Sequence, residues 1–184
     1  MVGRFFVAAP LTDDARHALA ARLSERGRPL PGRTVQPHNW HLTLQFLGDL
    51  DDLGYDRVLA ALDQEDLGER FRVRLGGLGA FPKPSRANVL WVAFAEGSER
   101  MGALAARVES AIDAAGLPDE DRPFRAHLTL SRIRPPQDVR ALVEGVAPVG
   151  VGWTVDSVVL YRSHVGPLGA RYEEMATFAL ERVR

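Results

Sequence analysis

The tetrapeptide His-Leu-Thr-Leu occurs twice in this chain, at residues 41–44 and again at 127–130. Side chains of a strand alternate between its two faces, so each histidine shares a face with the threonine two residues later. An imidazole titrates near neutral pH and can either accept or donate a proton. A hydroxyl can donate a hydrogen bond to a phosphoryl oxygen on which charge develops. Two such pairs in one cleft predict phosphodiester hydrolysis, with His41 and His127 as the acid–base pair.

The same alternation assigns the neighbouring side chains to faces. It places Gln45 beside Thr43 on the open face, and Ser131 beside Thr129. The leucines of both motifs and Phe46 then face the core. One His-Leu-Thr-Leu strand would be an ordinary half-buried strand, so the prediction depends on the second copy.

The two copies lie 86 residues apart in matched surroundings. Hydrophobic periodicity predicts a strand, a helix and then the motif strand before each copy. These elements are expected at 4–9, 13–25 and 40–47 in the first half, and at 88–95, from an N-cap at Ser98, and at 124–133 in the second. Rough two-fold symmetry would bring the two His-Thr pairs together. The alternative is an old duplication in which each histidine and threonine only satisfy one another.

The rest of the sequence continues both halves in the same way. Further helices are expected at 51–62 and 137–144, and further strands at 71–78, 153–161 and 172–180. The proline-rich loop at 79–86 is interpreted as the crossover between lobes. No glycine-rich loop follows the first strand, which argues against a parallel doubly wound sheet. The sequence therefore predicts an α+β fold. It is a single bilobal domain over 1–184, with two related strand–helix–strand lobes and mainly antiparallel sheets around a central cleft.

Arginines are the candidate phosphate ligands, because a guanidinium suits bidentate contacts to phosphate. Arg132 comes three residues after Thr129; strict alternation directs it to the core, although the end of a strand can twist it free. Arg162 follows the strand expected at 153–161. Arg125 precedes the second motif by two residues and should share its face. We rank Arg132 and Arg162 first.

Composition narrows the class of protein. The net charge is −1, from 23 basic and 24 acidic residues, which argues against a broad nucleic-acid-binding surface but not against a small anionic substrate. The chain has no cysteine, so thiolate metal sites and thiol nucleophiles are excluded and a reducing cytoplasm is the expected location. No apolar run is long enough to span a membrane, and the first residues do not resemble a signal peptide. The two best histidines lack a companion set of metal ligands.

These motifs and their flanks resemble the RNA 2′,3′-cyclic phosphodiesterase (2′-5′ RNA ligase-like) family of the 2H phosphoesterase superfamily. Its hallmark is two His-x-Thr-x motifs. The matching flanks are Phe5–Ala8, Asn39–Trp40, Gln45–Gly48, Gly76–Pro82, Phe124–Arg125, Ser131–Arg132 and Leu160–Ser163. Many members have proline before the second motif, where this chain has Ala126.

The resemblance implies hydrolysis of a 2′,3′-cyclic phosphate to a 2′-phosphomonoester without a metal or organic cofactor. It implies that His41 donates a proton to O3′ and that His127 is the base toward water. Thr43 and Thr129 would contact the phosphate. The expected partners are RNA ends or nucleotides with a cyclic phosphate, with no membrane and no obligate protein partner. Two alternatives remain, namely a 2′-5′ RNA ligase that runs the chemistry in reverse and a module that binds RNA ends without turnover.

Overall fold

The computed structural model of the chain describes residues 3–117, 123–167 and 169–182. Its strands are β1 Gly3–Pro10, β2 Arg33–Thr34, β3 His41–Leu50, β4 Phe71–Lys83, β5 Arg86–Glu96, β6 Leu128–Gln137, β7 Gly152–Val155, β8 Ser157–Gly166 and β9 Gly169–Ala179. Its helices are α1 Asp13–Ser24, α2 Asp52–Gln64, α3 Ser98–Ala114 and α4 Arg140–Gly145, with a short 3-10 helix, η1, at Pro37–Asn39. Among the described residues, no helix is long and apolar enough to cross a membrane.

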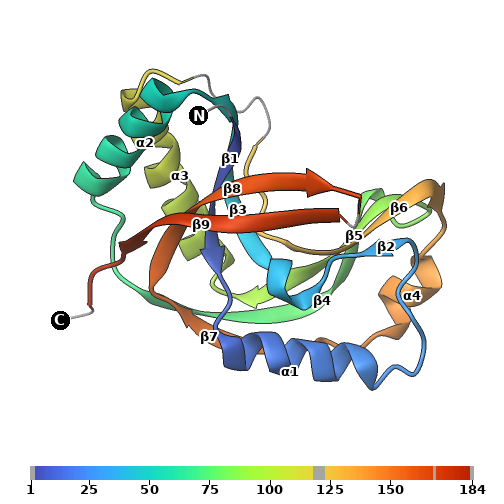
Figure 1. Cartoon of the computed structure of the whole chain (residues 1–184). Coiled ribbons are helices and arrows are strands. Elements are labelled where there is room, and N and C mark those ends of the chain that lie inside the picture. The colour runs from blue at the N-terminus through green and yellow to red at the C-terminus, as the bar shows by residue number, and fades with distance from the viewer. Residues whose placement is uncertain (1–2, 118–122, 168, 183–184) are drawn as a thin grey trace.

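Two antiparallel sheets make up the α+β fold that the sequence predicts (Figure 1). The first has the strand order β3-β1-β8-β9, and the second has the order β2-β6-β5-β4-β7. If β2 is set aside, the two orders correspond strand by strand, with β6 in the place of β3 and β5 in the place of β1. Each motif strand therefore has the same position in its own sheet.

The sheets do not coincide with the two halves of the sequence. β4 follows the first motif but lies in the second sheet, whereas β8 and β9 follow the second motif and lie in the first. Residues 79–86, expected to be the loop that crosses between lobes, instead complete β4, turn at 84–85 and begin β5, in a hairpin that pairs from Arg74 to Lys83. The single strand expected at 153–161 is also wrong. The chain leaves β7 at Val155 and enters the other sheet at Ser157, so it changes sheets here, as it also does between β3 and β4.

Local chemistry explains where the helices begin. The Thr12 side chain accepts a hydrogen bond from the backbone N–H of Ala15, which caps α1. Before α3 the predicted Ser98 cap is wrong, because Gly97 occupies the cap position with a φ of 86°. A Cβ at Gly97 would lie 2.7 Å from the carbonyl oxygen of Arg72, so both the backbone angle and the close approach require glycine.

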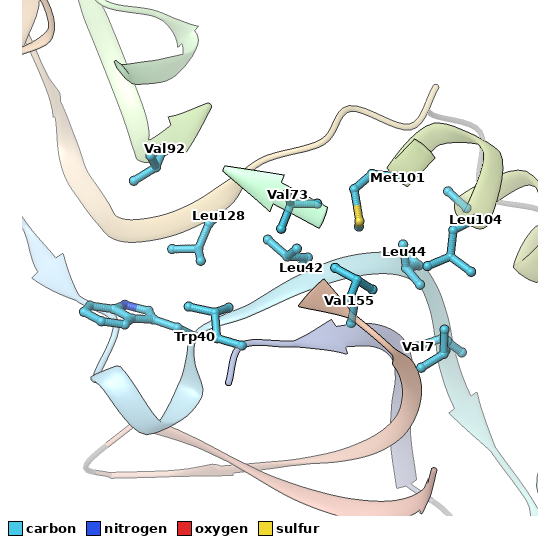
Figure 2. Close-up of a cluster of buried hydrophobic side chains, with 14 of the residues drawn as sticks. Val7, Trp40, Leu42, Leu44, Val73, Val92, Met101, Leu104, Leu128 and Val155 are labelled. Atoms are coloured by element: carbon cyan, nitrogen blue, oxygen red, sulfur yellow. The ribbon is translucent and has the colours of Figure 1, made fainter. Parts of the chain in front are cut away.

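The largest buried cluster joins both sheets and the helices that cover them. Figure 2 shows Leu42 of β3 near Leu128 of β6, and Leu44 of β3 near Leu104 of α3. The motif leucines thus belong to one shared core, as the alternation predicts. The single domain over 1–184 stays a prediction. The shared core fixes both motif strands in place, because their buried faces pack into the same cluster.

Candidate active site

A bulge in each motif strand decides which side chains reach the open side of the sheet. The β1–β3 register skips Leu44, and the β5–β6 register skips Leu130 in the same way. One extra residue shifts the alternation by one position. As a result the fifth residue after each histidine, Phe46 in β3 and Arg132 in β6, returns to the open side. The expectation that Phe46 faces the core is therefore wrong, and Arg132 comes to the cleft for the same reason.

The bulges also turn two polar side chains inward. Gln45 is 5% exposed and Ser131 is fully buried, so neither shares the open face of the motif threonines as strict alternation predicts. They occupy equivalent positions in the two copies. Neither the Gln45 Nε2 nor the Ser131 Oγ has a hydrogen-bond partner among the described residues.

A cavity of about 1020 Å³ contains both motifs. Its walls come mainly from β3, β6, α3, β9 and the segment before β6, with further residues from β1, β4, β5 and η1. Both motif histidines and both motif threonines line it, together with Arg125 and Arg132. Five of the six predicted site residues lie in these walls: His41, Thr43, His127, Thr129 and Arg132. The sixth, Arg162, does not.

Arg162 lies on the other face of the first sheet. Its guanidinium carbon is 6.0 Å from the centroid of the Phe5 ring, which belongs to the shared core, and its side chain passes close to Gly3. The preceding residue, Tyr161, packs instead on the open side against Phe6. Because neighbours in a strand face opposite sides, β8 cannot present both Tyr161 and Arg162 to the cavity. The structure therefore gives no support to Arg162 as a phosphate ligand.

Each catalytic candidate is held by the same backbone contact. His41 Nδ1 is 2.7 Å from the carbonyl oxygen of Asn39, and His127 Nδ1 is 2.7 Å from the carbonyl oxygen of Arg125. A carbonyl oxygen can only accept, so Nδ1 must carry the hydrogen in both rings. The remaining nitrogen, Nε2, is then free to accept a proton in the neutral ring or to donate one in the charged ring.

Aromatic rings complete the setting of both histidines. His41 is 4.8 Å from the Phe6 ring centroid and meets Tyr172 edge-on at 5.1 Å. His127 meets Phe81 edge-on at 5.1 Å and lies 6.0 Å from Trp91. Such contacts restrict ring rotation, so they hold each Nε2 in one direction. Phe6 and Phe81 fall within the flanks that carry the family resemblance, but their packing against the histidines was not predicted, because they come from strands far from the motifs.

Burial and positive neighbours favour the neutral form of both rings. The pKa of His41 is lowered to about 4, mainly by burial and to a smaller extent by Arg132 and His127, while the hydrogen bond to Asn39 opposes the change. The pKa of His127 is also lowered, first by burial and then by Arg125 and Arg132, against the hydrogen bond to the Arg125 carbonyl. A bound anion between the rings would reverse the contribution of the arginines. The site is therefore set to take up negative charge and a proton together.

The cavity walls carry both a cation and exposed aromatic rings. Arg132 lines the cavity, and its charge acts on both His41 and Tyr172. Phe46 and Phe124, which are 51% and 36% exposed, line the same cavity. Sequence reasoning missed Phe124, Tyr172 and Glu109 as wall residues. Only the equivalence of Phe46 with Arg132 had a signal, since both follow their histidine by five residues.

The histidine and carboxylate side chains of the described residues lack the arrangement that a metal site needs. Within the described ranges, no group of three or more histidine, aspartate or glutamate side chains is arranged to hold a metal ion. His164 instead pairs with Glu173 at 2.7 Å on the β8–β9 hairpin, and His38 and His17 are exposed.

Several known proteins are similar to this chain in amino-acid sequence. A family model described as the 2′-5′ RNA ligase superfamily matches residues 12–167. The RNA 2′,3′-cyclic phosphodiesterase of Thermus thermophilus is 35% identical over 190 residues, which cover 96% of this chain and 90% of that protein. The protein of that name from Aeropyrum pernix is 35% identical over 125 residues, or 66% of this chain and 68% of the other.

Solved structures give the same result. The crystal structure of TT0787 from Thermus thermophilus has a TM-score of 0.80 at 31% identity and covers 98% of this chain and all of its own. Escherichia coli LigT complexed with 3′-AMP has a TM-score of 0.83 and covers 99% of this chain and 100% of its own. Its identity is 23%, so this likeness concerns the fold alone.

Proposed function

The chain belongs to the 2′-5′ RNA ligase superfamily, and on that premise we propose that it hydrolyses RNA 2′,3′-cyclic phosphate ends to 2′-phosphomonoesters. Curated relatives named RNA 2′,3′-cyclic phosphodiesterase support this activity. The observation that carries the proposal is the pair of imidazoles in one cavity, each with Nδ1 bound to a backbone carbonyl. Two rings fixed in this way can move one proton in and another out during a single displacement at phosphorus.

The proposed reaction needs only water as a second reactant. His127 takes a proton from water as the water oxygen bonds to phosphorus. The bond between phosphorus and O3′ breaks, and His41 gives its proton to O3′. The phosphate stays on O2′, and exchange with solvent returns both histidines to their starting states. Whichever histidine donates the proton to the leaving oxygen, the reactive form of the enzyme has one charged ring, which gives a proton, and one neutral ring, which accepts one.

Other wall residues bind the phosphate and the nucleobase of the substrate. Thr43 and Thr129 donate hydrogen bonds to its non-bridging oxygens, and Arg132 neutralises its charge. The aromatic rings of Phe46 and Phe124 offer a surface on which a nucleobase can stack. Burial is the main reason that His41 is neutral in the empty site, and the charge of Arg132 adds to it. A phosphate beside Arg132 offsets that second contribution and so favours the proton that His41 must donate.

The direct test is incubation of the protein with a short RNA that ends in a 2′,3′-cyclic phosphate, followed by analysis of the product end. We expect a 2′-phosphomonoester, formed equally well in the presence of a chelator. A 3′-phosphomonoester would contradict the leaving group. Loss of activity on chelation, restored by a divalent metal, would replace the two-histidine mechanism with a metal-dependent one. Joining of RNA ends without hydrolysis would favour the ligase alternative, and binding without turnover the non-catalytic one.

The cytoplasmic location stays a prediction from the absence of cysteine.

A further inference from the structure

Two neighbouring strands place a pair of arginines on the open side of the second sheet. Arg33 of β2 pairs directly opposite Arg132 of β6, and Arg132 lines the catalytic cavity. Residues that pair in this way point to the same side of an antiparallel sheet, with Cβ atoms about 5 Å apart. Arg33 therefore shares the open side with Arg132. β2 consists of two residues only, so Arg33 is the one side chain that this strand presents there.

The Arg33 side chain lies at the edge of the cavity. Val35, two residues later, continues the backbone pairing with β6 and lines the cavity. On the other side Arg33 meets the start of β9, since a Cβ at Gly169 would lie 2.6 Å from Arg33 Nη2. The carbonyl oxygen of the next residue, Ala170, accepts a hydrogen bond from Asn39, which also lines the cavity. The Arg33 guanidinium thus lies where β2, β9 and η1 meet.

Neither arginine of this pair has an acidic partner. No described aspartate or glutamate forms an ion pair with Arg33 or Arg132. Like charges placed directly opposite each other on neighbouring strands destabilise a sheet, and a bound anion removes that repulsion. Both side chains are exposed, so an anion can reach them from solvent. The opposed pair therefore indicates an anion independently of its closeness to the catalytic histidines.

The cyclic phosphate accounts for only one of the two cations. Arg132 lowers the pKa of both His41 and His127, which places it beside the phosphate that these rings flank. Arg33 is not among the groups that shift either pKa, and it does not line the cavity. It is therefore farther from the reacting phosphate. In an RNA end the next negative charge is the phosphate on the 5′ side of the terminal nucleoside.

We propose that Arg33 binds this second phosphate, so that the protein prefers the end of an RNA strand to a cyclic mononucleotide. This inference rests on the proposed function and adds a subsite to it. Arg132 holds the cyclic phosphate, and Arg33 donates two parallel hydrogen bonds to the next phosphate along the strand. Arg134 is exposed and follows Arg132 by two residues, so the row of cations continues away from Thr129.

The experiment compares two dinucleotides that end in a 2′,3′-cyclic phosphate and differ only in the charge of the link between the nucleosides. One link is a phosphodiester and the other is an uncharged methylphosphonate. The 5′ nucleoside is a deoxynucleoside in both, so no neighbouring hydroxyl can attack the link. We expect the wild-type kcat/KM to be about tenfold higher for the charged dinucleotide, the effect of one hydrogen bond between charged groups. In Arg33→Gln the ratio should fall toward one.

Arg28→Gln is the matched control for the loss of charge. Arg28 is exposed, precedes Arg33 by five residues and does not line the cavity. This variant therefore loses the same charge from the protein but keeps the subsite, and its ratio should equal that of the wild type. Because each ratio compares two substrates on one protein, a partly unfolded preparation lowers both values of kcat/KM and leaves their ratio unchanged.

The outcomes separate the second phosphate subsite from the hydrolytic function. Equal wild-type values of kcat/KM for the two dinucleotides overturn the subsite and leave hydrolysis standing. A preference that Arg33→Gln retains, or that Arg28→Gln also loses, overturns the subsite as well. If neither dinucleotide is turned over, hydrolysis is contradicted, and the ratio of their dissociation constants replaces that of kcat/KM. A preference in binding that only Arg33→Gln abolishes then supports the subsite, and equal binding overturns it.

Discussion

The β3 half and the β6 half of the cavity share a backbone plan but differ in the side chains at equivalent positions. Each presents a histidine tied to the carbonyl two residues earlier, then a threonine, a bulge at leucine and a side chain on the open side. That last side chain is Phe46 in one half and Arg132 in the other. The comparison teaches that symmetry supplies the shared chemistry, whereas divergence at a single position gives one half an aromatic ring and the other half a cation.

The largest effect should come from removing either histidine. His41→Ala and His127→Ala should each lower kcat by about a hundredfold to ten-thousandfold, the usual contribution of a positioned acid or base. Steady-state hydrolysis of a 2′,3′-cyclic nucleotide measures this, with circular dichroism to verify folding. If one variant kept wild-type turnover, the two halves would not act as a pair.

The pH profile tests whether the pair shares one proton. Because the pKa values of both rings lie below the ordinary 6.5, the free enzyme loses the required proton as pH rises through that range. We expect kcat/KM to peak below pH 6.5 and then to fall about tenfold per pH unit. The peak of kcat should lie at higher pH, since bound phosphate favours the charged ring. A kcat/KM optimum above pH 7 would contradict this.

The threonines should matter less than the histidines and about equally to each other. Thr43→Ala and Thr129→Ala each remove one hydrogen bond to a charged oxygen, worth about 1.5–3 kcal/mol. Thr43→Ser and Thr129→Ser retain the hydroxyl and serve as controls. The measurement is kcat/KM of the four variants. A large difference between the two alanine variants would show that the phosphate sits closer to one half.

Removing the side chain at the position where the two halves differ, Arg132 or Phe46, should change the salt dependence of KM in different ways. Arg132→Ala should raise KM more than it lowers kcat, and KM should lose most of its dependence on salt, because a charge contact to phosphate is screened. Phe46→Ala should also raise KM, by about tenfold, through lost stacking, but should keep the salt dependence of the wild type. KM measured at low and high salt separates the two. Equal dependence of KM on salt in the two variants would contradict the different roles of Phe46 and Arg132.

The smallest effect concerns stability in acid. Burial depresses the pKa of His41 in the folded protein, so between 6.5 and about 4 the unfolded chain binds the proton first and stability falls as pH falls. Relative to wild type, His41→Gln should gain about 1–2 kcal/mol in this window, less than the full shift implies because part of the ring meets solvent. Urea unfolding at pH 7 and pH 4.5 measures the difference. The gain for His127→Gln should be smaller, and the reverse order would contradict the burial argument.

The sequence alone determined much of this protein. Two His-Leu-Thr-Leu strands at one spacing predicted the α+β class, the related motif strands and the meeting of His41, Thr43, His127 and Thr129 in one cavity. These features follow from residue type and from alternation, which are local properties. For the same reason the leucine faces of both motifs were predicted to be buried.

The tertiary structure decided the features that depend on strand register, sheet order and helix packing. Whether Phe46 and Arg132 reach the cavity depends on a skipped pairing with a neighbouring strand, and the sequence of one strand does not reveal its register. Arg162 is not a phosphate ligand in this structure, because Tyr161 of β8 faces the open side and its neighbour Arg162 therefore faces the opposite side. The change of sheet at Asp156 pairs β8 with β1, which is distant in the chain. The packing of α3 against β3 places Glu109 in the cavity wall. Each outcome depends on contacts between segments far apart in sequence, which hydrophobic periodicity within a segment does not encode.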